Sequence, residues 1–252
     1  MRAQPQFPNE QTGTGEFKRQ SDAFRHWVTE DGRSGYPAAA GRYHLYVSLA
    51  CPWAHRTIIV RALKGLTEVI GMTVVDPIRD DQGWAFHNGP GHSLDTTNGF
   101  HFLSEAYRAT DPNYHGRVTV PVLWDRVTKR IVTNSDDDLM RIFNGEFNRF
   151  TTSRLDLYPA ALRPQIDEMN DFVYERVNDG VYRAGFATSQ QVYERAARSV
   201  FVALDQLDTR LRDRRYLFGA QFVESDWRLF VTLLRFDAVY HGHFKCNLRR
   251  IV

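Results

Sequence analysis

The chain has 252 residues, of which 42% are hydrophobic and 25% are charged, so it can bury one large core or two smaller ones. Its 32 basic and 30 acidic residues give a net charge of +2, and no apolar run of about 18 residues occurs. We therefore expect no nucleic-acid partner and no membrane span. With only Cys51 and Cys246, a disulfide framework is excluded, and a reducing, cytoplasmic location is expected.

Residues 1–41 are polar and rich in glycine and proline, and they lack the apolar stretch of a signal peptide. The exception is the segment Phe24–Val28, with Trp27 at its centre. We expect residues 1–41 to form an extension that packs onto the body of the protein through this segment.

The stretch Tyr43–Arg61 carries the strongest chemical signal. Polar and apolar side chains alternate from His44 to Leu49, which predicts a strand with one buried face. Pro52 suits the first turn of a helix, because its φ is preset and it has no backbone N–H to leave unsatisfied. Cys51 is then the N-cap, where free N–H groups and the helix dipole should favour its thiolate. The alternative is a buried, inert cysteine.

The spacing after Cys51 limits its chemistry. In a C-x-x-C redox pair the second cysteine would stand at position 54, and this chain has Ala54 there. Cys51 therefore cannot form a disulfide with a near neighbour. Its reaction partner must be an external thiol, or the reaction stops at a mixed disulfide.

The next segment predicts a second strand and then a long loop. A helix over Pro52–Lys64, ended by Gly65, separates the first strand from an apolar strand over Val69–Val75, so the two should run parallel. Residues 76–116 are irregular, as in active-site loops and lids. The four histidines of this loop lack the spacing of a zinc helix, and we expect no metal.

Two further strands and a helix complete this half of the chain. Strands are expected over Arg117–Asp125 and Arg130–Thr133, and Pro121 inside the first predicts an edge or a special bend with a cis Val120–Pro121 bond. Ser135 or Asn134 should cap a helix that runs to about Phe143, with acidic residues in its first turn.

From Leu157 onward the apolar residues recur at helical spacing, and no convincing strand pattern remains. The segment Phe222–Tyr240 is apolar on several sides and predicts a buried helix, with Asp226 reaching back to the N–H of Val223. The chain thus divides into an α/β half that ends near residue 150 and an all-helical half.

These features together resemble the Xi class of glutathione transferases, the glutathionyl-hydroquinone reductases. The resemblance rests on CPWAHR, GWAF, GRVTVPVLWD and DWRLFVTLLRFDAVYHGHFKCNLRRI, and it covers nearly the whole chain. It implies an extension (1–41), a thioredoxin-like thiol-binding domain (42–150) and a helical substrate domain (151–252). It also implies a homodimer.

The resemblance implies a reaction and a set of site residues. Cys51 would attack the sulfur of a glutathionyl-hydroquinone, and a second glutathione would resolve the mixed disulfide. Tyr182 would exchange a proton with the quinol, and Tyr240 would tune the cysteine. The residues that hold glutathione would be Trp84, Arg117, Val118, Thr119, Val120, Ser135 and Asp136. For either tyrosine the alternative is ordinary core packing with a tethered hydroxyl.

The sequence departs from the family pattern in two places. Ser135-Asp136 stands where the family has Glu-Ser, the pair that grips the γ-glutamyl end of glutathione. Another low-molecular-weight thiol, such as mycothiol, is therefore the alternative to glutathione. The family pattern also continues beyond the point where this chain ends at Val252, which implies an incomplete helical domain.

Two other functions compete with the reductase. A general thioltransferase or dehydroascorbate reductase would use the same single thiol, and a panel of substrates would separate these enzymes. A non-catalytic binding protein on the same fold is the third interpretation. The Pro52-capped setting of Cys51 argues against it, and an unreactive Cys51 would favour it.

Overall fold

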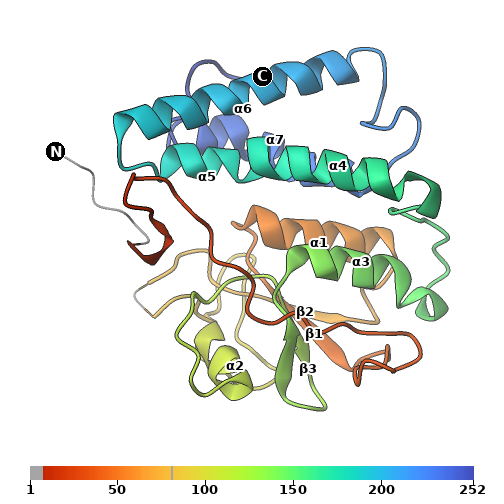
Figure 1. Cartoon of the computed structure of the whole chain (residues 1–252). Coiled ribbons are helices and arrows are strands. Elements are labelled where there is room, and N and C mark those ends of the chain that lie inside the picture. The colour runs from red at the N-terminus through yellow and green to blue at the C-terminus, as the bar shows by residue number, and fades with distance from the viewer. Residues whose placement is uncertain (1–7, 81) are drawn as a thin grey trace. The chain divides into compact units, whose positions relative to one another are not determined.

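The computed structural model describes residues 8–80 and 82–252 of the chain. The chain forms two compact units, shown in Figure 1. One unit combines Met1–Gln20, as far as these residues are described, with Leu157–Val252; the other is Ser21–Asp156. The predicted limits at residues 41 and 150 do not coincide with these units, and the assignment of domains stays a prediction.

The unit Ser21–Asp156 is built on a four-stranded sheet in the order β2-β1-β3-β4. The strands are β1 (Tyr43–Val47), β2 (Gly71–Val74), β3 (Val122–Asp125) and β4 (Arg130–Thr133). β2 runs parallel to β1, as predicted, whereas β3 is antiparallel to both β1 and β4. The ends of β1, β2 and β4 and the start of β3 therefore lie at one edge of the sheet.

Three helices cover this sheet: α1 (Pro52–Leu63), α2 (Leu103–Thr110) and α3 (Asp136–Gly145). α1 and α3 lie on one face and α2 lies on the other (Figure 1). A short 3-10 turn follows at Asn148–Phe150. The prediction that α1 begins at Pro52 is confirmed, and so is the cap of α3, where Ser135 Oγ accepts the N–H of Asp138 at 3.3 Å.

The expectation that β1 has one buried face is wrong, because all five of its residues are buried. The loop after β2 covers the second face. The hydroxyl of Tyr46 donates to Asp95 at 3.0 Å, and His44 hydrogen-bonds Thr73 at 2.8 Å. Burial, with the nearby Arg126 guanidinium, lowers the pKa of His44 to about 4 and keeps the ring neutral. Polar residues on a strand are thus satisfied by a loop that comes later in sequence.

The segment between β2 and β3 differs from the prediction in two respects. It is not wholly irregular, because α2 forms in it and contacts β4. The strand predicted over Arg117–Asp125 begins only at Val122, so residues 117–121 lie outside the ladder. The Val120–Pro121 bond is cis, as predicted.

Residues 21–41 pack along the outer strand β4, as the Phe24–Val28 signal predicted. The N–H of His26 donates to the carbonyl of Val132 at 3.0 Å, and Phe24 exchanges two backbone contacts with Asn134. Val28 is fully buried. The extension therefore covers the edge of the sheet.

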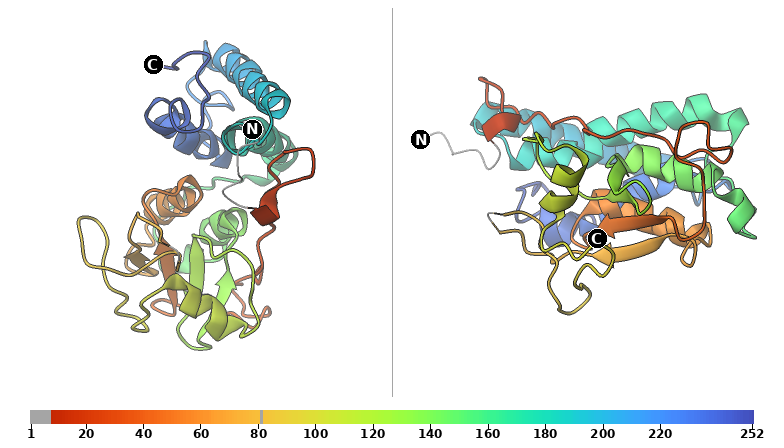
Figure 2. Two further views of the ribbon diagram at one scale, coloured as in Figure 1. Left: turned by 90° about the vertical axis from the view of Figure 1, so that its left-hand side faces the viewer. Right: turned by 90° about the horizontal axis from the view of Figure 1, so that it is seen from below.

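The other unit contains four main helices, α4 (Arg163–Val173), α5 (Gly180–Gly185), α6 (Gln190–Leu211) and α7 (Glu224–Arg235). π-helical turns follow α4 and α7 at Tyr174–Asn178 and Phe236–Tyr240, and short 3-10 turns lie at Pro8–Glu10 and Ala160–Leu162. Figure 2 shows the helices packed side by side around one core. Asp226 accepts the N–H of Val223 at 2.9 Å, as predicted.

Among residues 8–80 and 82–252, no helix combines the length and the apolar character that a membrane span requires.

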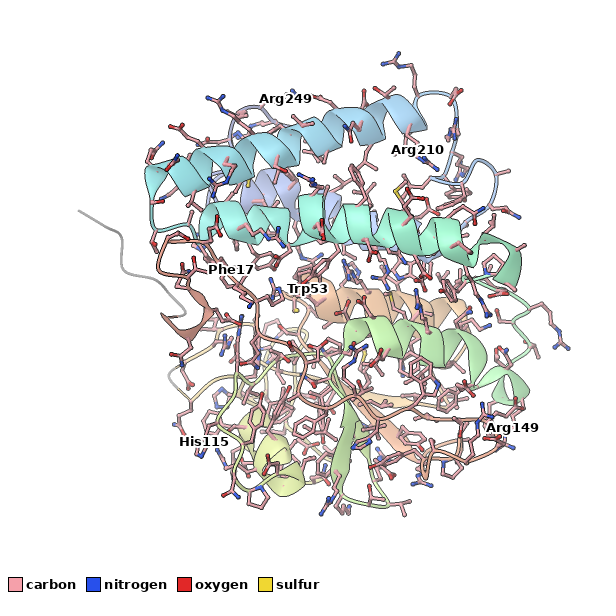
Figure 3. All side chains as sticks on the ribbon, in the orientation of Figure 1. Phe17, Trp53, His115, Arg149, Arg210 and Arg249 are labelled. Carbon is pink, nitrogen blue, oxygen red and sulfur yellow. The ribbon has the colours of Figure 1, made fainter. Side chains whose placement is uncertain are left out.

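The described residues before Ser21 belong to the helical unit. The side-chain amide of Gln11 donates to the carbonyl of Phe186 at 3.1 Å, and the N–H of Thr188 donates to the carbonyl of Gly15 at 3.1 Å. Phe17 packs edge-on against Phe186, with ring centroids 5.1 Å apart. Figure 3 shows Phe17 beside the helices of this unit.

Asp22 lies beside the start of α3, where carboxylates are crowded. Burial of the carboxyl, followed by the charges of Asp136 and Asp137, raises the pKa of Asp22 to about 7, although a hydrogen bond with Ser135 opposes the shift. Asp22 as a residue is exposed, so water screens part of this effect.

We predict that Asp22→Asn stabilises the protein at pH 8 and changes its stability little at pH 4. Below the unfolded-state pKa of about 3.9 both states are protonated. As pH rises to about 7, the native state alone holds the proton against ionisation, and the cost grows to a plateau. After the discount for screening we expect a gain of about 1 kcal/mol at pH 8, measured by urea unfolding at several pH values.

Asp31→Asn is the matched control for this measurement. Asp31 is an exposed carboxylate of the same segment, and the backbone N–H of Arg33, its nearest donor, lowers its pKa. Asn at that position should give no gain at pH 8. A gain from Asp22→Asn that is the same at pH 4 and pH 8 would contradict the proposed crowding.

Candidate functional site

Cys51 is the N-cap of α1 and is half-buried. Its Sγ accepts the N–H of Ala54 at 3.5 Å, and the thiol donates to the carbonyl oxygen of Val120 at 3.6 Å. Trp53 follows in the first turn, as Figure 3 shows. A sulfur that accepts from the first turn of a helix is placed to gain stabilisation as an anion.

The topology of the sheet explains how distant segments reach this sulfur. Cys51 follows the end of β1, Val120 precedes the start of β3, and Ser135 follows the end of β4. Because β3 runs opposite to its two neighbours, these three positions share one edge of the sheet. The contact between Cys51 and Val120 spans 69 positions and is a direct result of this arrangement.

The segment before β3 is held from both sides. The hydroxyl of Tyr107 on α2 donates to the carbonyl of Thr119 at 2.9 Å and accepts its N–H at 3.1 Å. The side-chain amide of Asn134 donates to Oγ1 of Thr119 at 3.1 Å. The predicted thiol-binding residues Arg117, Val118 and Thr119 are half-buried, and Val120 is buried. This backbone is therefore rigidly presented beside Cys51.

Trp84 lies in the loop after β2, and its surroundings fix the backbone there. Its carbonyl accepts the N–H of Leu103 at 2.9 Å, and the next residue, Ala85, accepts the N–H of Asp76 at the end of β2 at 2.9 Å. The guanidinium of Arg79 lies over the indole ring, 5.2 Å from its centroid. The loop thus brings Trp84 to the chain that leaves β2.

Ser135 and Asp136 begin α3, and they carry an interaction that the sequence did not predict. Arg56 on α1 is almost fully buried, and its Nη1 donates to Oδ2 of Asp136 at 2.8 Å. Its guanidinium also lies 4.6 Å from the Trp53 ring centroid. Asp137 lies 3.6 Å from the same Nη1 atom. The carboxylate of Asp136 is therefore already paired with a charge from the protein itself.

The only sequence signal for Arg56 was its place on a helix, four residues after Pro52, on the face that α1 turns toward α3. A buried arginine needs a carboxylate partner. Three consecutive aspartates at 136–138 could have supplied the candidate, but nothing local selects Asp136 among them. Asp22 was missed for the same reason, because its neighbours come from another part of the chain.

Tyr182 and Tyr240 lie together in the helical unit. Tyr182 is on α5, Tyr240 ends the π-helical turn after α7, and their ring centroids are 6.0 Å apart. Phe244 packs edge-on against both rings at 5.1 Å. Gly185 permits this approach, because a Cβ there would lie 2.3 Å from the Phe244 ring. The predicted pair of tyrosines thus belongs to one aromatic cluster, which Phe186 extends.

Cys246 differs sharply from Cys51. It is fully buried in the core of the helical unit, and burial raises the pKa of its thiol to about 12. It is therefore a neutral, inert thiol at physiological pH. Within the described parts of the chain, no three His, Cys, Asp or Glu side chains gather as a metal site would require.

The structure thus collects the predicted residues into two groups. The sheet unit holds Cys51, the segment 117–120 and the Ser135-Asp136 pair at one edge of the sheet, with Trp84 on the adjoining loop. The helical unit holds Tyr182 and Tyr240. The first group can form and break sulfur–sulfur bonds, and the second can exchange protons through phenol hydroxyls.

Comparisons with known proteins identify both halves of the chain. The family model described as "Glutathione S-transferase, N-terminal domain" matches residues 50–139, and the one described as "Glutathione S-transferase, C-terminal domain" matches residues 190–250. The glutathionyl-hydroquinone reductase YqjG of Escherichia coli is 49% identical over 94% of this chain and 74% of that protein. The glutathionyl-hydroquinone reductase PcpF of Sphingobium chlorophenolicum is 48% identical over the same shares.

Solved structures agree with these matches. The glutathione transferase Xi of Phanerochaete chrysosporium has a TM-score of 0.90 and 48% identity, over 93% of this chain and 80% of that chain. The glutathione-bound structure of E. coli YqjG has a TM-score of 0.88 and 49% identity, over 90% and 76% of the two chains. The chain belongs to the Xi class of glutathione transferases, the family of the glutathionyl-hydroquinone reductases.

Proposed function

We propose that this protein reduces glutathionyl-hydroquinones to free hydroquinones with a thiol as the reductant. The observation that carries the proposal is the placement of Cys51, whose sulfur caps α1 beside the carbonyl of Val120. The two relatives named glutathionyl-hydroquinone reductases support it at 48–49% identity. The chemistry follows from a single reactive thiol.

In the first step, the Cys51 thiolate attacks the sulfur of the conjugate. A sulfur–sulfur bond forms between Cys51 and the departing thiol group, and the carbon–sulfur bond to the quinol ring breaks. The electron pair of that bond stays with the ring, which takes up one proton. The quinol is thereby reduced, and the two sulfurs are oxidised to a mixed disulfide.

In the second step, another thiol resolves the mixed disulfide. Ala54 stands where a resolving cysteine would lie, and Cys246 is buried in the other unit's core, so neither can take this part. An external thiolate attacks the non-protein sulfur, releases the Cys51 thiolate and leaves as the symmetrical disulfide. The proton of the second thiol balances the one that the ring takes up.

The two tyrosines are assigned to proton exchange with the quinol. Tyr182 is half-buried on α5 and exchanges a proton with the quinol as the carbon–sulfur bond breaks. Tyr240 is buried beside Tyr182 and would adjust the polarity around the reacting sulfur. The Phe244 ring supports both residues through its edge-on contacts.

The reducing thiol is assigned as glutathione, which the glutathione-bound structure of YqjG supports by similarity. The segment 117–120 would align its backbone, and Trp84 would lie along it. A different low-molecular-weight thiol, such as mycothiol, is the second candidate. Asp136 is already paired with Arg56, and Asp22 and Asp137 add negative charge beside it. This crowding disfavours the α-carboxylate of a γ-glutamyl group.

A general thioltransferase or dehydroascorbate reductase remains the alternative activity, because the same Cys51 chemistry serves it. We also infer a reducing, cytoplasmic location, since a working Cys51 thiolate requires one. A homodimer is inferred from the family resemblance alone.

Cys51→Ser is expected to abolish reduction of a synthetic glutathionyl-hydroquinone, because a serine hydroxyl is not ionised at neutral pH. Cys246→Ala should retain full turnover. Iodoacetamide at pH 7 should label Cys51 and spare Cys246, whose pKa of about 12 keeps it protonated. Loss of turnover in Cys246→Ala with activity retained in Cys51→Ser would refute the mechanism.

Tyr182→Phe is expected to lower kcat by about 10²–10⁴, the usual contribution of a general acid or base. Exchange between the protein thiol and hydroxyethyl disulfide should be unaffected, since no quinol is involved. Tyr193→Phe is the matched control, because the Tyr193 hydroxyl donates to the carbonyl of Lys245 and has no assigned role. Equal rates for wild type and Tyr182→Phe would exclude Tyr182 from proton exchange.

The double substitution Ser135→Glu/Asp136→Ser is expected to lower KM for glutathione by roughly 10-fold or more. It restores the family pair, and a charged hydrogen bond regained in this way is worth about 1.5–3 kcal/mol. Turnover of each thiol on its own quinol conjugate should be compared in both proteins. If wild type already uses glutathione efficiently and the substitution changes nothing, the present pair serves glutathione as well as Glu-Ser does.

A further inference from the structure

Arg19 is an unusual feature of the helical unit, and the reaction described above does not use it. It lies in the N-terminal segment, and its side chain is mostly buried against α5. Its guanidinium carbon lies 4.6 Å from the ring centroid of Tyr182 and 5.4 Å from that of Phe17. The positive charge thus faces the ring of the tyrosine assigned to proton exchange.

Asp179 fixes this guanidinium in place. Its Oδ1 accepts Nε of Arg19 at 2.9 Å, and its Oδ2 accepts Nε of Arg183 at 2.9 Å. The Asp179 side chain is only 3% exposed. Asp179 directly precedes α5, so the carboxylate is anchored one helical turn before Tyr182. One carboxylate against two guanidinium groups leaves a net positive charge beside the phenol.

The surroundings of this pair add to the positive potential. The Arg19–Asp179 pair lines a cavity of about 530 Å³ between the N-terminal segment, α5 and α6. Five of its lining residues are basic and three are acidic: Lys18, Arg19, Arg176, Arg183 and Arg195 against Glu16, Glu175 and Asp179. A phenol that releases a proton here gains attraction from this excess of positive charge.

We propose that Arg19 is a positioning residue for Tyr182, which it holds by stacking on its ring and helps by stabilising negative charge on the phenol oxygen as the proton leaves. This inference rests on the proposed function, because it assigns Arg19 to the proton exchange of the same reaction. A cation over an aromatic face is attracted to the electron-rich ring, and the attraction grows as the phenol becomes phenolate.

The test compares Arg19→Met with Arg19→Lys in the reduction of a glutathionyl-hydroquinone. Arg19→Met removes the charge while keeping an apolar chain, and we expect kcat to fall about 10-fold, in the range of one desolvated cation–π contact. KM for the thiol should not change. Arg19→Lys keeps the charge and should restore kcat to within about 3-fold of wild type. Arg195→Met, which removes an exposed ion pair with Glu16, is the control and should be silent.

A double-mutant cycle separates this role from a structural one. If Arg19 acts through Tyr182, adding Arg19→Met to Tyr182→Phe should cause no further loss. Exchange between Cys51 and hydroxyethyl disulfide should proceed normally in every variant, which shows that they are folded. An unchanged kcat in Arg19→Met, or a full additional loss in the Tyr182→Phe background, would overturn the proposal.

A spectroscopic measurement keeps the inference testable if the proposed function fails. The titration of Tyr182 can be read at 295 nm as the difference between a protein and its Tyr182→Phe version. Arg19→Met should move this titration to higher pH, and no movement would contradict the proposal even if wild type does not reduce the quinol conjugate. The charged and titratable groups near this phenol are Arg19, Asp179, Arg183, Tyr174 and Tyr240.

Discussion

The reversed direction of β3 between β1 and β4 is the constraint on which the thiol site depends. A strand that runs opposite to both neighbours begins where they end. Cys51 after β1, Val120 before β3 and Ser135 after β4 therefore meet at one edge. No loop needs to travel far to bring them together. The same reversal places Asp125, at the end of β3, at the opposite edge.

Buried charge pairs hold the two edges in register. At the edge away from Cys51, Asp125 accepts two hydrogen bonds from Arg42, at 2.9 and 2.7 Å. Burial alone would raise the pKa of Asp125, but the hydrogen bonds from Arg42 and its other donors outweigh it and lower the pKa. At the edge that carries Cys51, Arg56 ties α1 to the first turn of α3. Removing one partner of such a pair would leave an unmatched buried charge.

Local chemistry determined which features the sequence could predict. The N-cap position of Cys51 follows from Pro52 and the strand before it, and the structure places both as expected. The Ser135 cap and the Asp226 contact are likewise set within four residues. Each of these signals needs only neighbours in sequence, so the propensities of caps and turns are enough.

Features set by distant partners could not be predicted in the same way. The second face of β1 is buried because Asp95 reaches Tyr46 from 49 positions away. Arg56 and Asp136 are 80 positions apart, and Arg19 and Asp179 are 160 apart. Alternation of polar residues reports one strand, whereas the loop that covers it is visible only in three dimensions. The resemblance supplied Tyr182 and Tyr240, which eleven tyrosines in the chain would otherwise have concealed.

The distribution of charge separates the two kinds of chemistry that the chain must perform. The start of α3 gathers carboxylates around Ser135, with Arg56 as their buried counter-ion, and this suits the recognition of a polar thiol. Around Tyr182 the balance is reversed, because Arg19 and Arg183 share one carboxylate. A thiol ligand and a departing proton need opposite electrostatic environments, since one brings charged groups of its own and the other leaves a negative charge behind. The sequence meets both needs with few residues, by giving each unit its own buried arginine beside the group that reacts.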